Sequence, residues 1–102
     1  MAEVAFSNAA EADLADIDEY SVALFGEDAA DSYMLGFNEA FVRLGDFPEI
    51  GRLLLELGPD IRCLTHKRHR IFYTFSNDRV FIVRIVHHSM DEQRALKAAA
   101  GQ

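Results

Sequence analysis

The chain has 102 residues, half of them hydrophobic and eight of them phenylalanine, which is enough apolar surface for one folded domain and excludes a disordered chain. Its formal net charge of −7 argues against unaided binding to bare nucleic acid. The N-terminus shows no secretory pattern, no apolar run could span a bilayer, and the single Cys63 cannot form an internal disulfide. We therefore expect a single cytoplasmic domain over residues 1–102, with no membrane partner.

The charges are divided between two parts of the chain. Up to Asp60 there are fourteen acidic residues against two arginines, which gives −12, whereas from Ile61 onward eight basic residues against three acidic ones give +5. A domain with opposite signs on two surfaces can select two different partners by complementary potential. The sequence therefore predicts a small protein that binds two partners.

The first half of the chain predicts a strand and two helices. Val4 to Phe6 is typical of an edge strand, and Asn8 is placed to cap the helix that follows. Gly26 separates this helix from a second one, which ends near Gly45 and Pro48. Each helix has one apolar stripe, so the two should form a helical hairpin. The stripes are Ala10, Leu14, Ile17, Ser21 and Leu24 in the first helix and Ala30, Tyr33, Phe37, Phe41 and Leu44 in the second.

The second half predicts a sheet, because from Ile61 onward the hydrophobic period changes to two. We expect strands over residues 61–65, 70–75 and 79–86, followed by a short helix from Met90 to Ala100. The predicted fold class is α+β, with an N-terminal strand, a helical hairpin on a mainly antiparallel sheet, and a short C-terminal helix.

The register of the last two strands follows from the pattern if the loop between them has three residues, Ser76 to Asp78. Phe75 then pairs with Arg79, and one face of the hairpin is wholly apolar or aromatic. That face collects Ile71, Tyr73, Phe75, Phe81, Val83 and Ile85. Arg70 and Arg84 share the opposite face. Their neighbours there include Phe72, Val80, Ile82 and Val86. We expect the helices to cover the first face and the second to contact a partner.

A basic cluster precedes the second strand and a histidine pair follows the last. The cluster is Arg62, His66, Lys67, Arg68, His69 and Arg70. It is either a solvated turn or a basic rim that faces a partner, and the scarcity of cations earlier in the chain favours the rim. His87 and His88 could serve as general acid or base near neutral pH. No cysteine partner or HxxxH spacing supports zinc, Cys63 is expected to be buried, and Ser89 has no orienting pair, so no metal, cofactor or catalytic residue is predicted.

The chain is similar to ParE toxins of the RelE/ParE superfamily, the toxic half of bacterial toxin–antitoxin pairs. The resemblance extends from about Val4 to Asp91 and rests on the order and spacing of several segments. These segments are Ala12-Asp13-Leu14-Ala15-Asp16-Ile17 with Tyr20, Phe41-Val42-Arg43-Leu44 with Phe47-Pro48-Glu49-Ile50-Gly51, Ile61-Arg62, Arg70-Ile71-Phe72-Tyr73, Val83-Arg84-Ile85-Val86-His87 and Met90-Asp91.

The resemblance implies a cytoplasmic toxin that a ParD-like antitoxin neutralises in a hetero-oligomer. For the ParE branch the implied target is DNA gyrase, with no direct specific contact to nucleic acid, whereas the RelE branch cleaves mRNA on the ribosome. Ribosome-dependent relatives tend to carry a Lys or Glu on the sheet face and a Tyr after the last strand, and this sequence lacks both. The strongly negative total charge also suits a ribosomal site poorly. We therefore expect a protein that is not an enzyme and that poisons gyrase.

The candidate site residues form two groups. The expected target-binding residues are Arg62, Arg70, Arg84, His87, His88, Met90 and Asp91. The expected antitoxin-binding residues are Asp16, Glu19, Tyr20, Asp31, Met34 and Arg84, and the carboxylates among them would face basic residues of the antitoxin. Two other functions remain open, an RNA-cleaving enzyme that uses His87 or His88 as its acid, and a member that binds an antitoxin without being toxic.

Overall fold

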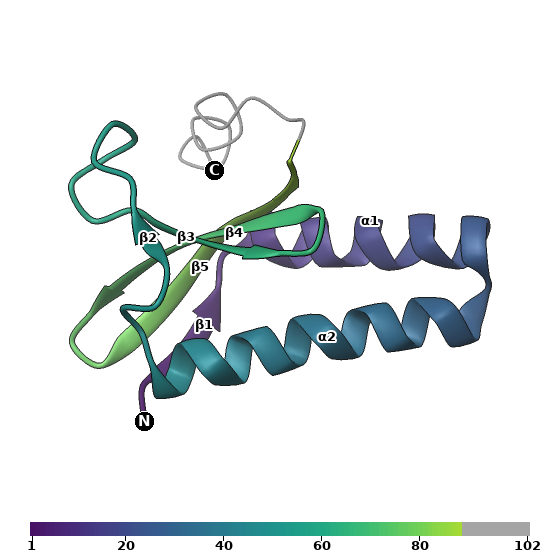
Figure 1. Ribbon diagram of the computed structural model, residues 1–102, viewed down its shortest axis with the longest axis horizontal. Coiled ribbons are helices and arrows are strands. Elements are labelled where there is room, and N and C mark those ends of the chain that lie inside the picture. The colour runs from purple at the N-terminus through teal and green to yellow at the C-terminus, as the bar shows by residue number, and fades with distance from the viewer. Residues whose placement is uncertain (89–102) are drawn as a thin grey trace.

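The computed structural model describes residues 1–88, which form two helices and five strands (Figure 1). In chain order the elements are β1 (Glu3–Phe6), α1 (Asn8–Phe25), α2 (Glu27–Asp46), β2 (Arg52–Leu53), β3 (Arg62–His66), β4 (His69–Ser76) and β5 (Arg79–His87). The predicted helix from Met90 to Ala100 lies outside the described residues. Neither described helix is long and apolar enough to cross a membrane.

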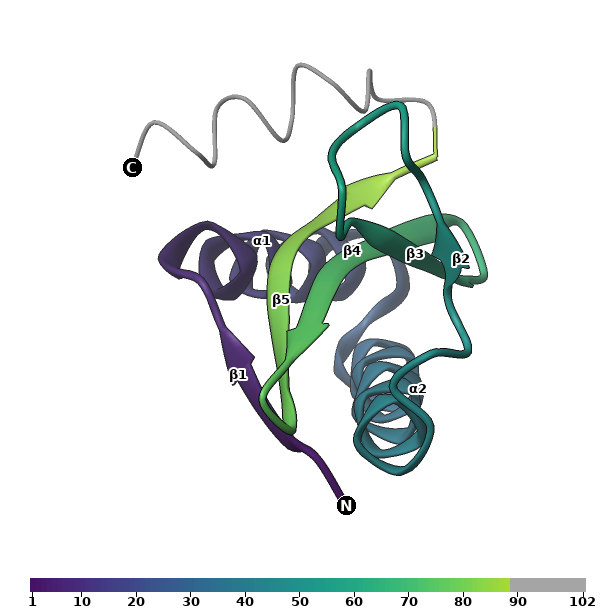
Figure 2. The ribbon, with the colours of Figure 1, turned by 90° about the vertical axis from the view of Figure 1, so that its left-hand side faces the viewer.

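The strands form one mixed sheet in the order β1-β5-β4-β3-β2, as the end-on view of Figure 2 shows. β1 is parallel to β5, and the other neighbours are antiparallel. The helical hairpin packs on one face of this sheet, which we call the core face, and the opposite face is the outer face. The α+β fold predicted from the sequence is confirmed, with β2 as a short additional strand at the far edge.

The main core lies between the hairpin and the core face. From the helices it takes Ala10, Phe37, Ala40, Phe41 and Leu44, and from the sheet Ile71, Tyr73, Val80, Ile82 and Ile85. Phe6 of β1 packs edge-on against Phe41, with 4.9 Å between the ring centroids. The apolar stripe predicted for α2 is therefore the core stripe, and that of α1 is buried at Ala10 but not at Leu24, which is 56% exposed.

The sequence pattern predicted Asn8 as the cap of helix α1. In the structure the cap is Ser7. The Ser7 hydroxyl accepts a hydrogen bond from the Ala10 amide at 2.9 Å and donates one to the Val83 carbonyl at 2.7 Å. One side chain thus satisfies a free amide of the helix and a free carbonyl of β5. Asn8 is already the first helical residue, so it is not in the cap position from which a side chain could bond both the Ala10 amide and the Val83 carbonyl.

Beyond Ile82 the edge of β5 has no strand beside it, because β1 pairs with β5 only from Arg79 to Ile82. Asp13 of α1 takes the place of the missing strand. Its carboxylate accepts hydrogen bonds from the Ile85 amide at 2.9 Å and from the Arg84 guanidinium at 2.7 and 2.9 Å. Ser7 and Asp13 together attach the first two turns of α1 to the open edge of the sheet.

The predicted register of the β4–β5 hairpin is wrong, because the loop has two residues. Ser76 pairs with Arg79, and Asn77 and Asp78 both have positive φ, 52° and 57°. Such a loop matches the twist of a hairpin better than a three-residue loop does. Val80 and Ile82, expected on the outer face, are therefore fully buried in the core, and Phe81, expected in the core, is 39% exposed.

A bulge then shifts the register by one residue between Phe72 and Tyr73, so that Phe72 pairs with Arg84 and Ile71 with Ile85. Val83 is the extra residue on β5, since Tyr73 pairs with Ile82. After Ile82 the bulge shifts by one residue which side chains of β5 point to the core face. The core face can therefore stay apolar along the whole hairpin even though the loop has two residues. Without it Arg84, not Ile85, would oppose Ile71.

The outer face is partly covered by the chain itself, which the sequence had not predicted. Phe72 and Val86, expected to be exposed there, are buried with Leu54 and Cys63 in a second cluster, with Leu57 and Ile61 packed against it. Burial raises the pKa of the Cys63 thiol, in keeping with the expected core role of this residue. The face left for a partner is therefore smaller than the sequence suggested.

The connection after α2 is held in place by Tyr73. The Tyr73 hydroxyl donates to the Pro48 carbonyl at 2.7 Å and accepts from the Gly51 amide at 2.8 Å. Only glycine fits at position 51, since a Cβ there would lie 2.5 Å from the Tyr73 hydroxyl oxygen.

We predict that Asp13→Ala lowers the free energy of unfolding by about 2–4 kcal/mol, because it leaves the Arg84 guanidinium and the Ile85 amide without their acceptor. Urea unfolding followed by circular dichroism measures the effect. The matched control is Asp16→Ala, which removes an exposed carboxylate one turn farther along α1. Equal stability of the two variants would contradict the role assigned to Asp13.

Candidate functional site

Two of the arginines predicted to bind a target take part in the scaffold. Arg84 and Asp13 form an ion pair in which each side chain is only 14% exposed, and the Asp13 hydrogen bond raises the pKa of Arg84. Arg62 donates hydrogen bonds to the backbone carbonyls of Glu49 at 3.2 Å and Gly51 at 3.0 Å. Both arginines thus hold segments that are distant in sequence, and their predicted contacts with a target or antitoxin remain predictions.

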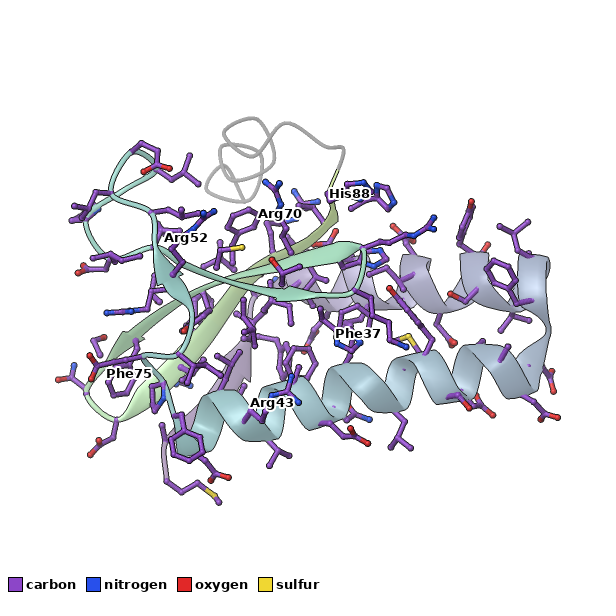
Figure 3. The ribbon with its side chains drawn as sticks, viewed as in Figure 1. Phe37, Arg43, Arg52, Arg70, Phe75 and His88 are labelled. Carbon is purple, nitrogen blue, oxygen red and sulfur yellow. The ribbon has the colours of Figure 1, made fainter. Side chains whose placement is uncertain are left out.

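Arg70 lies on β4, opposite Thr65 of β3 and Val86 of β5. Figure 3 shows Arg70 and His88 on the side of the sheet away from α2, whereas Phe37 lies between the sheet and that helix. Arg70 and Arg84 were expected to share one face of the sheet, and the register agrees, because Arg84 pairs directly with Phe72, two residues from Arg70. The Arg84 guanidinium, however, is held by Asp13 of α1. The remaining predicted target residues, Met90 and Asp91, lie outside the described residues.

Three histidines form a row across the sheet. His66 of β3 pairs directly with His69 of β4, and His69 pairs directly with His87 of β5. The His69 and His87 rings meet edge-on with 5.6 Å between centroids, and the His88 ring lies 4.3 Å from that of His87. Sequence reasoning could not find this row, because it depends on the register that the loop and the bulge set.

The β3–β4 turn is joined to the end of β5 beside this row. The Arg68 carbonyl accepts a hydrogen bond from the His88 amide at 2.9 Å. The Lys67 ammonium lies 5.4 Å from the centroid of the Tyr33 ring, over its face. We call the group made by His66, Lys67, Arg68, His69, His87 and His88 the histidine end of the sheet.

The inner part of the histidine end packs against α2. His69 Nδ1 is hydrogen-bonded to the Tyr33 hydroxyl at 2.7 Å, and the His66 ring stacks at a tilt on Phe37, with 4.7 Å between centroids. His66 lies so close to the helix backbone that a Cβ at position 36 would be 2.9 Å from its ring, which explains Gly36. Within residues 1–88, His66 Nε2 is a buried side-chain nitrogen without a hydrogen-bond partner.

The packing disfavours the charged form of both inner histidines. Desolvation lowers the pKa of His66, with Lys67 and Arg43 adding to the effect and Glu39 opposing it. Desolvation also lowers the pKa of His69, and the neighbouring His87, His66 and His88 lower it further. Burial raises the pKa of the Tyr33 hydroxyl, which keeps it a neutral hydrogen-bonding group. In the part of the chain that the structure describes, no three side chains come together as a metal site would require.

The acidic surface predicted to bind an antitoxin lies on the hairpin. Asp16, Glu19 and Asp31 are exposed, Met34 is half-buried, and Tyr20 is 66% exposed. The hairpin extends beyond the sheet in Figure 1, so its far end has no sheet beneath it. This explains why Leu24, the last residue of the α1 stripe, is exposed. The large apolar side chains left open there are Tyr20, Val22, Leu24 and Phe25.

The chain matches known proteins over most of its length. The family model for the ParE toxin of type II toxin-antitoxin systems, parDE, matches residues 4–92. The chain belongs to the ParE toxin family. Proteins named Toxin ParE1 from two strains of Mycobacterium tuberculosis, CDC 1551 / Oshkosh and H37Rv, are each 33% identical to it over 91 residues, which is 88% of this chain and 93% of theirs. The resemblance inferred from the sequence is thereby confirmed.

A solved structure described as the chromosomal ParDE TA system from P. aeruginosa has a similar fold. The TM-score is 0.74 at 22% identity, and the match covers 85% of this chain and 96% of that one. This similarity supports the fold of a ParE toxin independently of the family match. It agrees with a helical hairpin packed on a five-stranded sheet as the arrangement of this chain.

We predict that this ParE toxin loses stability as the pH falls below about 6.5. The two inner histidines have lowered pKa values in the folded state, so their stabilising effect is complete above the unfolded pKa and is lost as the pH falls toward the folded values. Urea unfolding between about pH 7 and pH 5.5 measures the slope. His66→Phe, which suits the apolar site beside Phe37, should reduce that slope. An unchanged slope in His66→Phe would contradict the prediction.

Proposed function

We propose that this chain is a cytoplasmic toxin that poisons DNA gyrase by protein contact and that a ParD-like antitoxin neutralises it in a hetero-oligomer. The observation that carries the proposal is membership of the ParE family over residues 4–92, since that branch of the superfamily is the one associated with gyrase. The split of charge between helices and sheet supports two separate partners.

The hairpin is the surface that best suits the antitoxin. The two helices carry ten acidic residues and a single arginine, Arg43. At the far end of the hairpin these carboxylates surround exposed Tyr20, Leu24 and Phe25. A segment with apolar residues flanked by Lys and Arg would bury the apolar side chains and neutralise the acidic rim. We therefore assign the antitoxin contact to Asp16, Glu19, Tyr20, Asp31 and Met34.

The internal hydrogen bonds of two arginines favour a non-enzymatic contact with gyrase over RNA cleavage. A ribonuclease would need cations near the scissile phosphate to stabilise charge in the transition state. Arg62 and Arg84 are engaged with the connection after α2 and with Asp13. Arg70 and the exposed His87 and His88 remain the assigned target contacts, together with Met90 and Asp91.

One observation keeps mRNA cleavage as a second candidate. The row of His66, His69 and His87 places imidazoles side by side near the exposed cations Lys67 and Arg68, as general acid–base chemistry would require. In this candidate His87 or His88 acts as the acid and Arg70 stabilises charge. Its activity would depend on the ribosome and would leave gyrase unaffected.

The antitoxin assignment predicts that Glu19→Lys with Asp31→Lys weakens binding of the cognate antitoxin by about tenfold or more, because one carboxylate on each helix changes sign. The control, Glu56→Lys with Asp60→Lys, makes the same change of total charge at exposed positions outside the hairpin and should alter affinity by less than about twofold. Isothermal titration at two salt concentrations measures both. Salt-independent binding, or equal loss in the two variants, would overturn the assignment.

The target assignment predicts that the purified toxin inhibits supercoiling by purified gyrase and leaves mRNA intact in a translation extract. His87→Ala with His88→Ala should reduce inhibition, whereas Arg79→Gln, at the other end of β5, should not. Cleaved mRNA with normal supercoiling would establish the second candidate instead. Absence of both effects would mean that the chain binds its antitoxin without acting as a toxin.

A further inference from the structure

We propose that the solvent-facing side of α2 is a second contact for the antitoxin, and that an amphipathic helix of the antitoxin, with apolar side chains flanked by Lys and Arg, docks along it. This inference rests on the proposed function, because its partner is the antitoxin assigned there to the far end of the hairpin. We call this side of α2 the outer stripe. Its residues are Asp28, Asp31, Leu35, Glu39, Val42 and Asp46.

The outer stripe lies on the side of α2 opposite the core. Its members follow one another at steps of three or four residues, which places them along one side of a helix, and all of them are exposed. Leu35 is 58% exposed and Val42 is 61% exposed. These two lie seven residues apart, which is about 10.5 Å along the helix. Figure 1 shows α1 and the sheet on one side of α2 and no described element on the other.

The outer stripe ends at an exposed apolar loop whose backbone is held in place. Phe47 and Ile50 follow α2 directly and are 62% and 44% exposed. Residues 46–50 line a shallow depression of about 430 Å³. The backbone of this loop is hydrogen-bonded to the side chains of Arg62 in β3 and Tyr73 in β4. Because a backbone that is already fixed loses little entropy on binding, the loop is suited to receive an apolar side chain of a partner.

The charges of the outer stripe select a basic partner. All of its charged members are acidic, whereas Arg43, the basic residue of α2, lies on the side toward His66 of the sheet. A second copy of this chain docked through the same stripe would bring carboxylates against carboxylates, which disfavours that pairing. Nucleic acid is disfavoured for the same reason. A protein segment with Lys and Arg around an apolar centre matches both the charge and the apolar side chains of the stripe.

A helix fits the outer stripe better than an extended segment does. The side of a helix offers its partner side chains and no free backbone groups, so an extended segment lying on it would leave its own N–H and C=O groups unpaired. A helix pairs those groups internally and packs its side chains between those of α2. Apolar residues seven positions apart lie on one face of such a helix, at the spacing of Leu35 and Val42.

The outer stripe also continues the surface already assigned to the antitoxin. Asp31 belongs to both, and Leu35 lies about one turn farther along the same helix. An antitoxin that reaches Asp31 from the far end of the hairpin therefore meets Leu35, Val42 and the apolar loop in turn. Two linked contacts with one partner raise the total affinity, because the second contact forms at a high effective concentration.

The first test measures binding of the purified cognate antitoxin to the full chain by isothermal titration. Leu35→Gln with Val42→Gln should weaken binding by about tenfold, because both apolar contacts of the stripe are lost. The matched control, Leu55→Gln with Phe81→Gln, removes two exposed apolar side chains outside α2 and should weaken binding by less than about twofold. Thermal unfolding checks that each variant is folded. Unchanged affinity in the first variant, or equal weakening in both, would overturn the inference.

The second test identifies what occupies the stripe and does not depend on the stability of a variant. Benzoylphenylalanine in place of Leu35 should form a photochemical cross-link to the antitoxin, at a segment that has apolar residues seven positions apart with Lys or Arg beside them. The same group in place of Leu55 should give no such product. A cross-link to a second copy of the toxin, or no product at Leu35, contradicts the assigned occupant.

The outcomes separate this inference from the proposed function. Binding that is weakened by Glu19→Lys with Asp31→Lys, and left unchanged by Leu35→Gln with Val42→Gln, would remove the second contact and leave the proposed function standing. Failure of the unaltered chain to bind the antitoxin at all would overturn the proposed function and this inference together.

Discussion

The attachment of α1 to the open edge of β5 is the constraint on which the rest of this structure depends. β1 is too short to cover β5, and Ser7 and Asp13 satisfy the backbone groups that it leaves unpaired. Because Asp13 also binds Arg84, the contact fixes the start of α1, the bulged segment of β5 and one arginine together. A sheet edge is thereby closed by a helix, which removes a site for unwanted strand pairing.

Two consequences for function follow from this arrangement. The hairpin is held at its base and reaches beyond the sheet, so that acidic and apolar side chains at its far end stay open to a partner. The sheet is closed on its core face by the helices and partly on its outer face by the segment from Leu54 to Ile61. At the histidine end, Lys67, Arg68, His87 and His88 are exposed. A ParE toxin of this form offers an acidic surface and a basic surface that are built from different elements.

The histidine end links the stability of the fold to pH. The pKa values of His66 and His69 are lowered because α2 buries them, while the exposed His87 and His88 continue the row into solvent. Because His69 is hydrogen-bonded to Tyr33 and His66 packs on Phe37, protonation of the inner pair is connected to the packing of the sheet against α2. Stability at this end of the sheet therefore falls as the pH falls.

The sequence by itself determined the α+β fold, the hairpin with the α2 core stripe, the strands from position 61 onward and the ParE family. These features depend on patterns among neighbours in the chain, which the residues themselves carry. Only the tertiary structure decided the Ser7 cap, the two-residue loop at Asn77 and Asp78, the bulge at Val83 and the pairing of Arg84 with Asp13. A change of one residue in loop length reverses which side chains face the core, and the bulge reverses it again. The row of His66, His69 and His87 exists only in the resulting register, so no local pattern could reveal it.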